Sequence, residues 1–314
     1  MNKKRILVNI FLAVFLPVIS ILSYQKVLDY KKESEFKVLL EKRRAALEEL
    51  KLKLKDEVNK FKGESGVIIK DLESGWEFSW QKDKLFASAS LVKLPIMAAT
   101  FYAVEEGKTG LEQNIALKNS DKLTGSGTLK NIPAGTLFTL ERLIGLMIYD
   151  SDNTATNIIT NLLGIDYLNN QFKAFGLKNT LLLRKVADYS MRAKGVENYT
   201  NAEDVAFLLE KIYRGNLINK EWSEKSINIL KLTHLNDRIP KYLPAQITVA
   251  HKTGLERNVC HDAGIVFTSK GDFLICVLTR YKNGDIKGAK EFIAKLASLT
   301  YSFTMANNLF YERR

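Results

Sequence analysis

Cysteine and histidine are scarce in this 314-residue chain, which has two cysteines and three histidines. The histidines, His234, His251 and His261, and the cysteines do not have the spacing of a recognisable zinc motif. The sequence therefore predicts neither a metal site nor a cofactor. Low-complexity tracts and internal repeats are also absent, and the composition is that of a globular chain and not of a disordered one.

The two cysteines, Cys260 and Cys276, leave the question of a disulfide open. Cys276 lies in the apolar run Phe273–Leu278, where a buried free thiol is favoured over a disulfide because an unpaired cysteine behaves as a small apolar residue. Pairing between the two cysteines stays an alternative at this point.

The chain has no dense cluster of residues of one charge sign, although its formal net charge is +12. Lys3, Lys4 and Arg5 contribute +3, and residues 25–63 hold twelve Lys or Arg against eight Asp or Glu, a surplus of +4. The rest of the chain keeps about +5, which is ordinary for a globular surface. No basic run with interleaved aromatic residues occurs, so we expect no nucleic-acid partner.

An apolar segment near the amino terminus, Ile6–Tyr24, carries no charge and follows the basic cluster at residues 3–5. This arrangement is typical of a single membrane span with the carboxyl-terminal part outside the cytoplasm. No Ala-x-Ala-like site follows, so we expect an uncleaved anchor and not a removed signal peptide. A buried core helix is the other alternative, but it would not normally be apolar on every face.

The segment after the anchor is highly charged and has neither proline nor glycine before Gly63. Its apolar residues predict one long amphipathic helix, with heptad spacing of Leu40, Leu47, Leu54 and Phe61. Arg43 and Glu57 occupy intermediate seam positions, so we expect no coiled-coil dimer and a monomeric globular part. We predict a cytoplasmic tip and anchor over residues 1–24, a solvated stalk over 25–44, and one domain over 45–314.

This domain is predicted to have an α+β fold. Alternating apolar residues and turn signals predict strands at Gly66–Asp71, Trp76–Trp80, Ile247–Lys252, Ala263–Thr268 and Phe273–Thr279. Helical spacing predicts helices at Ser90–Glu106, Leu140–Leu163, Ile165–Phe175, Ala202–Tyr213 and Ile286–Phe303. Strands at both ends of a helical centre imply one antiparallel sheet flanked by helices, with a second helical lobe inserted.

Three short motifs carry residues suited to nucleophilic chemistry. Ser90 and Lys93 lie three residues apart at the start of an apolar helix, so their side chains share one face. Such a lysine can deprotonate the serine only if burial or a second cation destabilises its ammonium form. Ser151-Asp152-Asn153 follows in the chain, and Lys252-Thr253-Gly254 comes after it, at the end of a predicted strand.

In this order the three motifs resemble the signature of class A β-lactamases and penicillin-binding proteins. Segments 86–90, 125–127, 140–148 and 261–266 also look like class A sequences, and the likeness covers about residues 45–305. The resemblance implies the β-lactamase/DD-peptidase-like fold, an α/β sandwich with a helical lobe. It also implies a serine hydrolase that forms an acyl-enzyme with a β-lactam or a peptidoglycan-derived small substrate.

The resemblance implies a catalytic role for four residues. Ser90 attacks the lactam carbonyl, and Lys93 accepts its proton. Ser151 then passes a proton to the leaving nitrogen, with Lys252 nearby. The backbone N–H groups of Ser90 and Leu255 would hold the oxyanion, and each such donor is typically worth about 3–4 kcal/mol.

The resemblance also implies a set of substrate-binding residues. Asn153 would hold the side-chain amide of the substrate, and Thr253 with Lys252 would hold its carboxylate, with Gly254 in the same motif. Arg238, fourteen residues before Lys252, occupies a place where some family members put a further carboxylate-binding arginine. A solvated surface arginine is the alternative at this position.

The chain departs from the class A pattern at the loop where those enzymes carry a deacylating glutamate. Aligning the loop on Arg184 and Thr200 places Val186 where the glutamate is expected. The nearest acids are Asp188 and Glu197, and we expect Asp188 to be the deacylating base if its carboxylate reaches the water.

Three interpretations follow from this departure. With a working base the chain is a β-lactamase. Without one it is a penicillin-binding D-Ala-D-Ala peptidase or another cell-wall hydrolase that releases penicillin slowly. A non-catalytic sensor is the third, but a pure binding module has no need of an activated serine.

Overall fold

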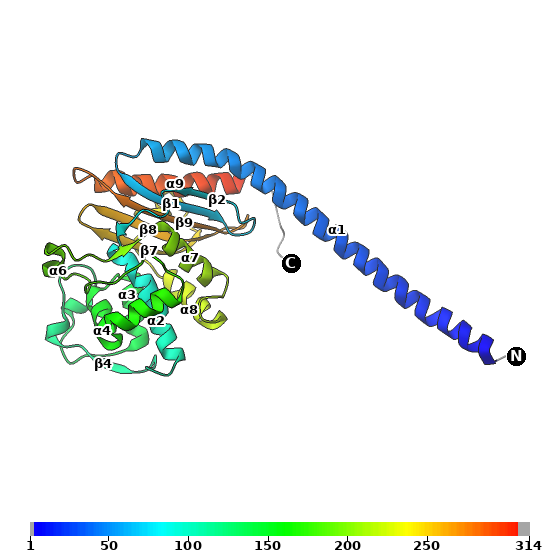
Figure 1. Cartoon of the computed structure of the whole chain (residues 1–314), viewed down its shortest axis with the longest axis horizontal. Coiled ribbons are helices and arrows are strands. Elements are labelled where there is room, and N and C mark those ends of the chain that lie inside the picture. Colours follow the sequence, from blue (N-terminus) through cyan, green and yellow to red (C-terminus); the bar gives the residue numbers. More distant parts are fainter. Residues whose placement is uncertain (1–2, 307–314) are drawn as a thin grey trace.

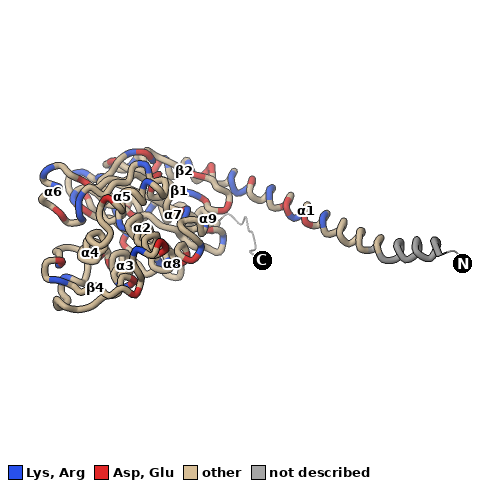
Figure 2. The backbone as a smooth tube through the Cα atoms, turned by 60° about the horizontal axis from the view of Figure 1, so that its bottom comes forward, with Lys and Arg blue, Asp and Glu red and all other residues tan. Residues whose placement is uncertain are grey.

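One unbroken helix, α1 (Lys3–Lys60), leads into a globular body and projects away from it (Figure 1). The structure is a computed structural model, which describes the backbone of residues 3–306 and the side chains of residues 15, 16 and 18–306. The long helix agrees with the absence of proline and glycine between residues 18 and 62. Basic and acidic residues are interspersed along the stalk and over the body (Figure 2).

The body is built on a five-stranded antiparallel sheet with the strand order β2-β1-β9-β8-β7. The strands are β1 (Glu64–Asp71), β2 (Glu77–Trp80), β7 (Thr248–Glu256), β8 (Val259–Phe267) and β9 (Phe273–Arg280). β1 pairs with β9 along its whole length, so segments from both ends of the domain meet in one sheet. This confirms the predicted α+β architecture, and it leaves β7 as an edge strand.

Helices cover both faces of this sheet (Figure 1). The last turns of α1 and the helix α9 (Ile286–Ala306) lie on one face. The other face carries a helical lobe, which contains α2 (Lys93–Glu105), α3 (Leu140–Tyr149), α4 (Asn153–Leu163), α5 (Ile165–Ala174), α6 (Tyr189–Ala193), α7 (Ala202–Tyr213) and α8 (Lys220–Leu230). Short elements complete it: β3 (Phe86–Ala87), β6 (Tyr199–Thr200), β4 (Asn114–Ala116), β5 (Leu137–Thr139), η2 (Asn119–Asp121) and η3 (Leu129–Asn131).

Each face of the sheet has its own apolar core. On β1, Val67 and Ile69 pack toward α1 and α9, while Ile68 packs toward the lobe. Strands buried on both faces have long apolar runs, as β9 has from Phe273 to Leu278. The two cysteines belong to opposite cores, Cys260 to the α1 and α9 side and Cys276 to the lobe, and both are free and buried. Side chains on opposite faces of a sheet cannot form a disulfide.

The carboxyl-terminal part of α1 is an integral part of the body. Leu47, Leu50, Leu54 and Val58 are buried against the sheet. Arg43 is also buried, and its Nε donates to Asp71 Oδ2 at 2.7 Å while its Nη1 donates to the carbonyl of Lys270 at 2.6 Å. The charged seam position that argued against a coiled coil is therefore an ion pair with the domain.

The predicted membrane span is not visible as such in this fold. Among the residues that the structure describes, no helix contains a stretch sufficiently long and apolar to cross a bilayer. The predicted span Ile6–Tyr24 overlaps residues 1–14, whose side chains lie outside the described part. Within it, the described residues Leu16, Val18, Ile19, Ile21 and Leu22 are exposed on α1.

Two of the predicted boundaries that were wrong lie at motif residues. The helix expected over residues 140–163 is split into α3 and α4, because Ser151 between them has a φ of 53°, in the left-handed region. Lys252 does not end its strand, because β7 continues to Glu256 and pairs with β8 up to Val259. Both differences bear on the site, since Ser151 and Lys252 are motif residues.

Candidate active site

The predicted nucleophile, Ser90, lies in the short 3₁₀ turn η1 (Ala89–Val92), which runs directly into α2. The backbone N–H of Lys93 donates to the carbonyl of Ser90. Residues three apart in a 3₁₀ turn are eclipsed, so the side chains of Ser90 and Lys93 lie on one side of the turn. Strand β7 passes close by at Gly254, where an added Cβ would come within 3.3 Å of the Ala89 Cβ.

Two buried lysines meet at one serine hydroxyl. Lys93 Nζ lies 3.2 Å from Ser151 Oγ, and Lys252 Nζ lies 3.0 Å from the same oxygen. Lys93 also donates to the Ser151 carbonyl at 2.5 Å and to Asn153 Oδ1 at 2.9 Å. Three sequence segments that are far apart in the chain are thus brought together.

The protonation of these lysines is set by burial. Burial lowers the pKa of Lys93 from 10.5 to about 7, although the carboxylates of Asp152 and Glu256 oppose the shift. Burial, with the positive charges of Lys93 and Arg238, lowers the pKa of Lys252 well below its usual value. Two ammonium groups at one hydroxyl repel each other, so one amine is readily neutral near pH 7.

The turn between α3 and α4 positions Ser151 and Asn153. Asp152 caps α4 by accepting the Ala155 N–H at 2.9 Å, and its second oxygen accepts the Leu129 N–H at 2.8 Å. A side-chain cap of this kind satisfies a free N–H at the start of a helix and fixes the turn before it. The buried Asp152 thereby holds its two motif neighbours in place.

A cavity of about 90 Å³ opens beside the nucleophile. Ser90, Asn153 and Leu255 line it, together with the loop residues Val186 and Glu197. Among the described residues, the Ser90 side chain has no hydrogen-bond partner, and it is half-buried. The hydroxyl is therefore available to a molecule that enters the cavity.

The loop over residues 184–198 carries an apolar residue at the position of the expected glutamate. Val186 is buried and lines the cavity. Its backbone is fixed by Asn157 of α4, which accepts the Val186 N–H at 3.1 Å and donates to the Val186 carbonyl at 3.0 Å. No carboxylate therefore occupies this place in the site.

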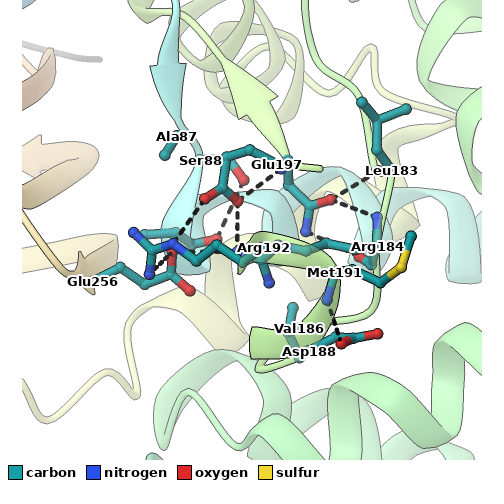
Figure 3. A network of polar contacts seen from close by, with 12 residues as sticks. Ala87, Ser88, Leu183, Arg184, Val186, Asp188, Met191, Arg192, Glu197 and Glu256 are labelled. Atoms are coloured by element: carbon teal, nitrogen blue, oxygen red, sulfur yellow. Dashed lines mark hydrogen bonds and ion pairs between the residues drawn. The ribbon is translucent and has the colours of Figure 1, made fainter. Parts of the chain in front are cut away.

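Asp188, the predicted deacylating base, caps helix α6. Its Oδ1 accepts the Met191 N–H at 3.1 Å and the Ser190 hydroxyl at 2.8 Å, and Asp188 is not among the residues that line the cavity. These two hydrogen bonds lower the pKa of its carboxyl. Figure 3 shows the carboxylate at the start of this helix, below Val186.

Four charged residues form an ion-pair network that joins the loop over residues 184–198 to the end of β7 (Figure 3). The spacing of these residues in the sequence did not predict the network. Glu197 pairs with Arg184 at 2.5 Å and with Arg192 at 3.2 Å. Glu256 at the end of β7 lies 3.5 Å from Arg184 and 3.4 Å from Arg192. Among the described residues that line the cavity, Glu197 and Glu256 are the acidic ones, and both are engaged by arginine.

The predicted carboxylate-binding residues lie on and beside β7. Thr253 is buried and is opposite Asp262 of β8. Arg238 is 2% exposed, so the alternative of a solvated surface arginine is wrong. Its Nε lies 3.2 Å from Cys260 Sγ, while its Nη1 has no hydrogen bond among the described residues.

His261 is a supporting residue that sequence reasoning did not assign. Its Nε2 lies 2.8 Å from the carbonyl of Ala87, just before the nucleophile turn, and its Nδ1 accepts the Thr279 N–H at 3.1 Å. Burial lowers the pKa of His261 to about 4, so the ring is neutral and donates through Nε2. The histidine thus joins β8 and β9 to the segment that carries Ser90.

Comparison with known proteins agrees with this geometry. A sequence model described as the β-lactamase enzyme family matches residues 49–304. The chain belongs to this family.

Known proteins similar to this chain are distant in sequence and close in fold. β-Lactamase VEB-1 of Pseudomonas aeruginosa is 24% identical over 280 residues, which cover 82% of this chain and 91% of VEB-1. A β-lactamase from Sphaerobacter thermophilus has a TM-score of 0.76 and 29% identity, covering 81% of this chain and 97% of its own. The structure of PBP-A has a TM-score of 0.75 and 29% identity, with 82% and 96% covered.

Family membership and these relatives make the chain a serine hydrolase of the β-lactamase type. The fold is the β-lactamase/DD-peptidase-like α+β fold. A metal-binding cluster of three or more His, Cys, Asp or Glu side chains is not present in the described part of the chain.

Proposed function

We propose that this β-lactamase family member opens the amide of β-lactams by acylation of Ser90. The observation that carries the proposal is the placement of Ser151 Oγ within 3.2 Å of two buried lysine amines, beside the cavity that Ser90 lines. A buried lysine with a pKa of about 7 is partly unprotonated at neutral pH and can act there as a general base, and Lys93 has this pKa.

In the proposed reaction, Lys93 Nζ takes the proton of Ser90 as the serine oxygen bonds to the lactam carbonyl carbon. The carbon–nitrogen bond of the ring then breaks, and Ser151 passes a proton to the departing nitrogen. Lys93, now an ammonium 3.2 Å from Ser151 Oγ, replaces that proton and returns to its neutral form, while Lys252 lies 3.0 Å from the same oxygen. The product is an ester on Ser90, with the oxyanion held in passing by the N–H groups of Ser90 and Leu255.

Substrate binding is assigned to residues at the two ends of the cleft. Asn153 would hold the side-chain amide, since it lines the cavity next to Ser90. Thr253, Gly254 and Lys252 of β7 would hold the carboxylate, with Arg238 as a further donor. Nη1 of the buried Arg238 supports the last assignment, because it has a 3.5 Å ion pair with Asp237 but no hydrogen bond among the described residues, and a buried N–H without a hydrogen-bond acceptor is costly.

Hydrolysis of the acyl-enzyme is proposed to be the slow step. Val186 offers no carboxylate, and the carboxylates of Glu197 and Glu256 are engaged by Arg184 and Arg192. Asp188 could act as the base only if α6 shifted, because its carboxylate now caps that helix. A general base must come within hydrogen-bond reach of its water, so turnover is limited where none does.

A D-Ala-D-Ala peptidase is the second candidate, and the apolar Val186 is the observation that favours it. An enzyme that transfers or releases a peptide needs the same acylation residues but no dedicated base against a penicillin ester. The likeness to PBP-A points the same way, since a variant of PBP-A forms an acyl-enzyme complex with penicillin G. The two candidates differ in the lifetime of the penicilloyl ester.

We also propose that residues 6–24 anchor the chain in a membrane, with the enzyme on the extracytoplasmic side. The described residues Leu16, Val18, Ile19, Ile21 and Leu22 are exposed on α1, and a lipid environment would cover them. Fractionation of cells that express the full chain tests this. Recovery in the membrane fraction after a carbonate wash is expected, and release of the chain by the wash would refute it.

Mass spectrometry of the chain mixed with benzylpenicillin tests the proposed function. The parent is expected to gain one penicilloyl mass, and Ser90→Ala is expected to gain none. Loss of the adduct within minutes, with penicilloate in solution, identifies a β-lactamase. A persistent adduct identifies the peptidase, provided that a D-Ala-D-Ala peptide is cleaved; if neither is turned over, the sensor interpretation holds. A parent without any adduct contradicts the proposal.

A further inference from the structure

A fully buried carboxylate behind the proposed carboxylate-binding residues has no part in the chemistry described so far. Asp262 of β8 is 0% exposed, and its Oδ1 lies 2.9 Å from Nδ1 of His251 on β7. His251 is also buried. Burying a charge is costly unless the charge is paired and hydrogen-bonded, so the surroundings of this pair are informative.

The sheet makes room for the pair through a glycine. Gly264 is directly opposite His251 in the β7–β8 register. A Cβ on Gly264 would come within 2.4 Å of the His251 Cβ, a distance that real side chains do not show. The position of the imidazole therefore depends on the absence of a side chain at residue 264.

The second oxygen of Asp262 reaches the segment that carries Arg238. Its Oδ2 accepts the backbone N–H of Ile239 at 3.0 Å. Ile239 is the first residue of η4 (Ile239–Tyr242), and Arg238 is the residue directly before it. Asp262 thus fixes the backbone from which the arginine side chain extends.

The charges around Asp262 and the face of the sheet on which it lies support this connection to Arg238. Arg238 Nε contacts Cys260, which is two residues from Asp262 on β8 and therefore on the same face of the sheet. Arg238 also lowers the pKa of Lys252, while Asp262 acts in the opposite direction. Two cations of the proposed subsite therefore share one buried anion.

We infer that Asp262, partnered by His251, is a positioning residue that holds Arg238 in place to bind the substrate carboxylate. The inference rests on the proposed function, which assigns Arg238 and Lys252 to that carboxylate. Asp262 does not touch the substrate in this arrangement. Its effect is transmitted through the Ile239 N–H and through the charge it presents to the two cations.

Acylation by benzylpenicillin and by its methyl ester, which lacks the carboxylate, tests this inference. Asp262→Asn keeps the shape and can still accept the Ile239 N–H, but it loses the charge. We expect the half-saturating concentration of benzylpenicillin to rise about tenfold, with the maximal acylation rate within about twofold of the parent and the methyl ester unaffected. A purely structural role would instead affect both compounds equally.

Asp237→Asn is the matched control. Asp237 Oδ1 lies 3.5 Å from Arg238 Nη1, but the side chain is 42% exposed and pairs with Lys290 at 2.5 Å. The control is expected to behave as the parent with both compounds. If it matches Asp262→Asn, the effect is one of general charge and the inference is wrong.

Combination with Arg238→Gln separates failure of the inference from failure of the proposed function. Asp262→Asn should add much less in the Arg238→Gln background than in the parent, because its action through Arg238 is already lost and only its charge near Lys252 remains. If Arg238→Gln does not discriminate the acid from the ester, the proposed carboxylate subsite is wrong. If Arg238→Gln discriminates the acid from the ester and Asp262→Asn does not, only the inference about Asp262 is wrong.

His251→Gln provides a second variant in case Asp262→Asn does not fold. It removes the imidazole but leaves the contact between Asp262 and the Ile239 N–H. A rise of about threefold in the half-saturating concentration of benzylpenicillin is expected, again without an effect on the ester. Equal effects on the acid and the ester would contradict the inference.

Discussion

The two sides of the cleft around Ser90 differ in what they offer a substrate. On one side, Lys93, Ser151 and Lys252 form a continuous set of contacts between 3.0 and 3.2 Å. On the other side, the loop over residues 184–198 presents Val186, and its neighbouring carboxylate Glu197 is bound by arginine. The residues proposed for acylation are therefore in contact with one another, whereas the side proposed for deacylation has no free carboxylate among the described residues that line the cavity.

This difference teaches that forming and releasing an acyl-enzyme make separate demands on a fold. Acylation needs amines whose ammonium forms are destabilised, which the buried core supplies to Lys93 and Lys252. Deacylation needs a carboxylate within reach of a water, and this depends on a surface loop. The loop can therefore change while the buried lysines stay.

The largest expected effect is the loss of all covalent labelling in Ser90→Ala. No other residue in the proposed reaction can carry the acyl group, so the adduct with benzylpenicillin should disappear completely. Intact-mass spectrometry checks this result. An adduct of unchanged mass on the variant would show that the nucleophile is another residue. The comparison of the two sides of the cleft around Ser90 would then no longer apply.

Lys93→Met is expected to slow acylation by about 10³-fold, because it removes the proposed general base. The variant should also be more stable. The folded pKa of Lys93 lies below 10.5, so the folded state binds fewer protons between about pH 7 and 10.5 and stability rises with pH in that range.

In Lys93→Met the buried amine is gone, so its contribution to the pH dependence of stability is lost. The melting temperature at pH 7 should rise by a few degrees. Stopped-flow acylation and thermal melts check the two parts separately. A variant that loses activity and stability together would show that Lys93 is needed for folding and would leave the base unidentified.

Acylation should fall as the pH is lowered. Below pH 7 the amine of Lys93 becomes protonated and can no longer accept the serine proton, so the rate should drop about tenfold per pH unit. Single-turnover acylation by a chromogenic cephalosporin between about pH 5 and 8 measures this limb. A flat profile down to pH 5 would mean that another group takes the proton.

Val186→Glu should supply a carboxylate to the side of the cleft that lacks a free one. A carboxylate at this cavity-lining position could activate a water, so we expect penicilloyl release to accelerate at least about tenfold. Val186→Gln is the matched control, since it has a similar size and no basic oxygen. Equal rates for the two variants would show that the position does not reach the ester.

Asp188→Asn is expected to have the smallest effect. Its carboxylate caps α6 and is outside the cavity, so deacylation should stay within about two- to threefold of the parent, with a slightly lower melting temperature. The parallel variant Glu197→Gln tests the acid that does line the cavity. A large loss in Asp188→Asn would show that α6 moves and that Asp188 is the base after all.

Much of the fold followed from local patterns in the sequence. The strands at both ends of the domain and α7 were predicted because their apolar spacing is regular over the whole element. The break at Ser151 was missed, because a residue in the left-handed region leaves no mark in a helical apolar pattern. Helix α8 was also missed, although its Trp222 stacks on Phe101 of α2 and its Lys225 pairs with Glu141 of α3.

The motif residues of the site were predicted, and their surroundings were not. Lys93, Ser151 and Lys252 were found because short motifs recur at known spacing. The pairing of Arg184 with Glu256 joins residues 72 positions apart, and no local pattern encodes such a contact. The same applies to His261, whose ring reaches the carbonyl of Ala87.

The way α1 enters the body has a mechanical consequence. Its last turns are part of the core, and Arg43 is locked to Asp71, so the helix cannot swivel about a flexible joint. A helix rises about 1.5 Å per residue, so the 19 steps from Tyr24 to Arg43 span about 28 Å. If residues 6–24 lie in a bilayer, the helix holds the catalytic body at a fixed distance from the membrane surface. Deleting whole turns from the helix would shorten that distance.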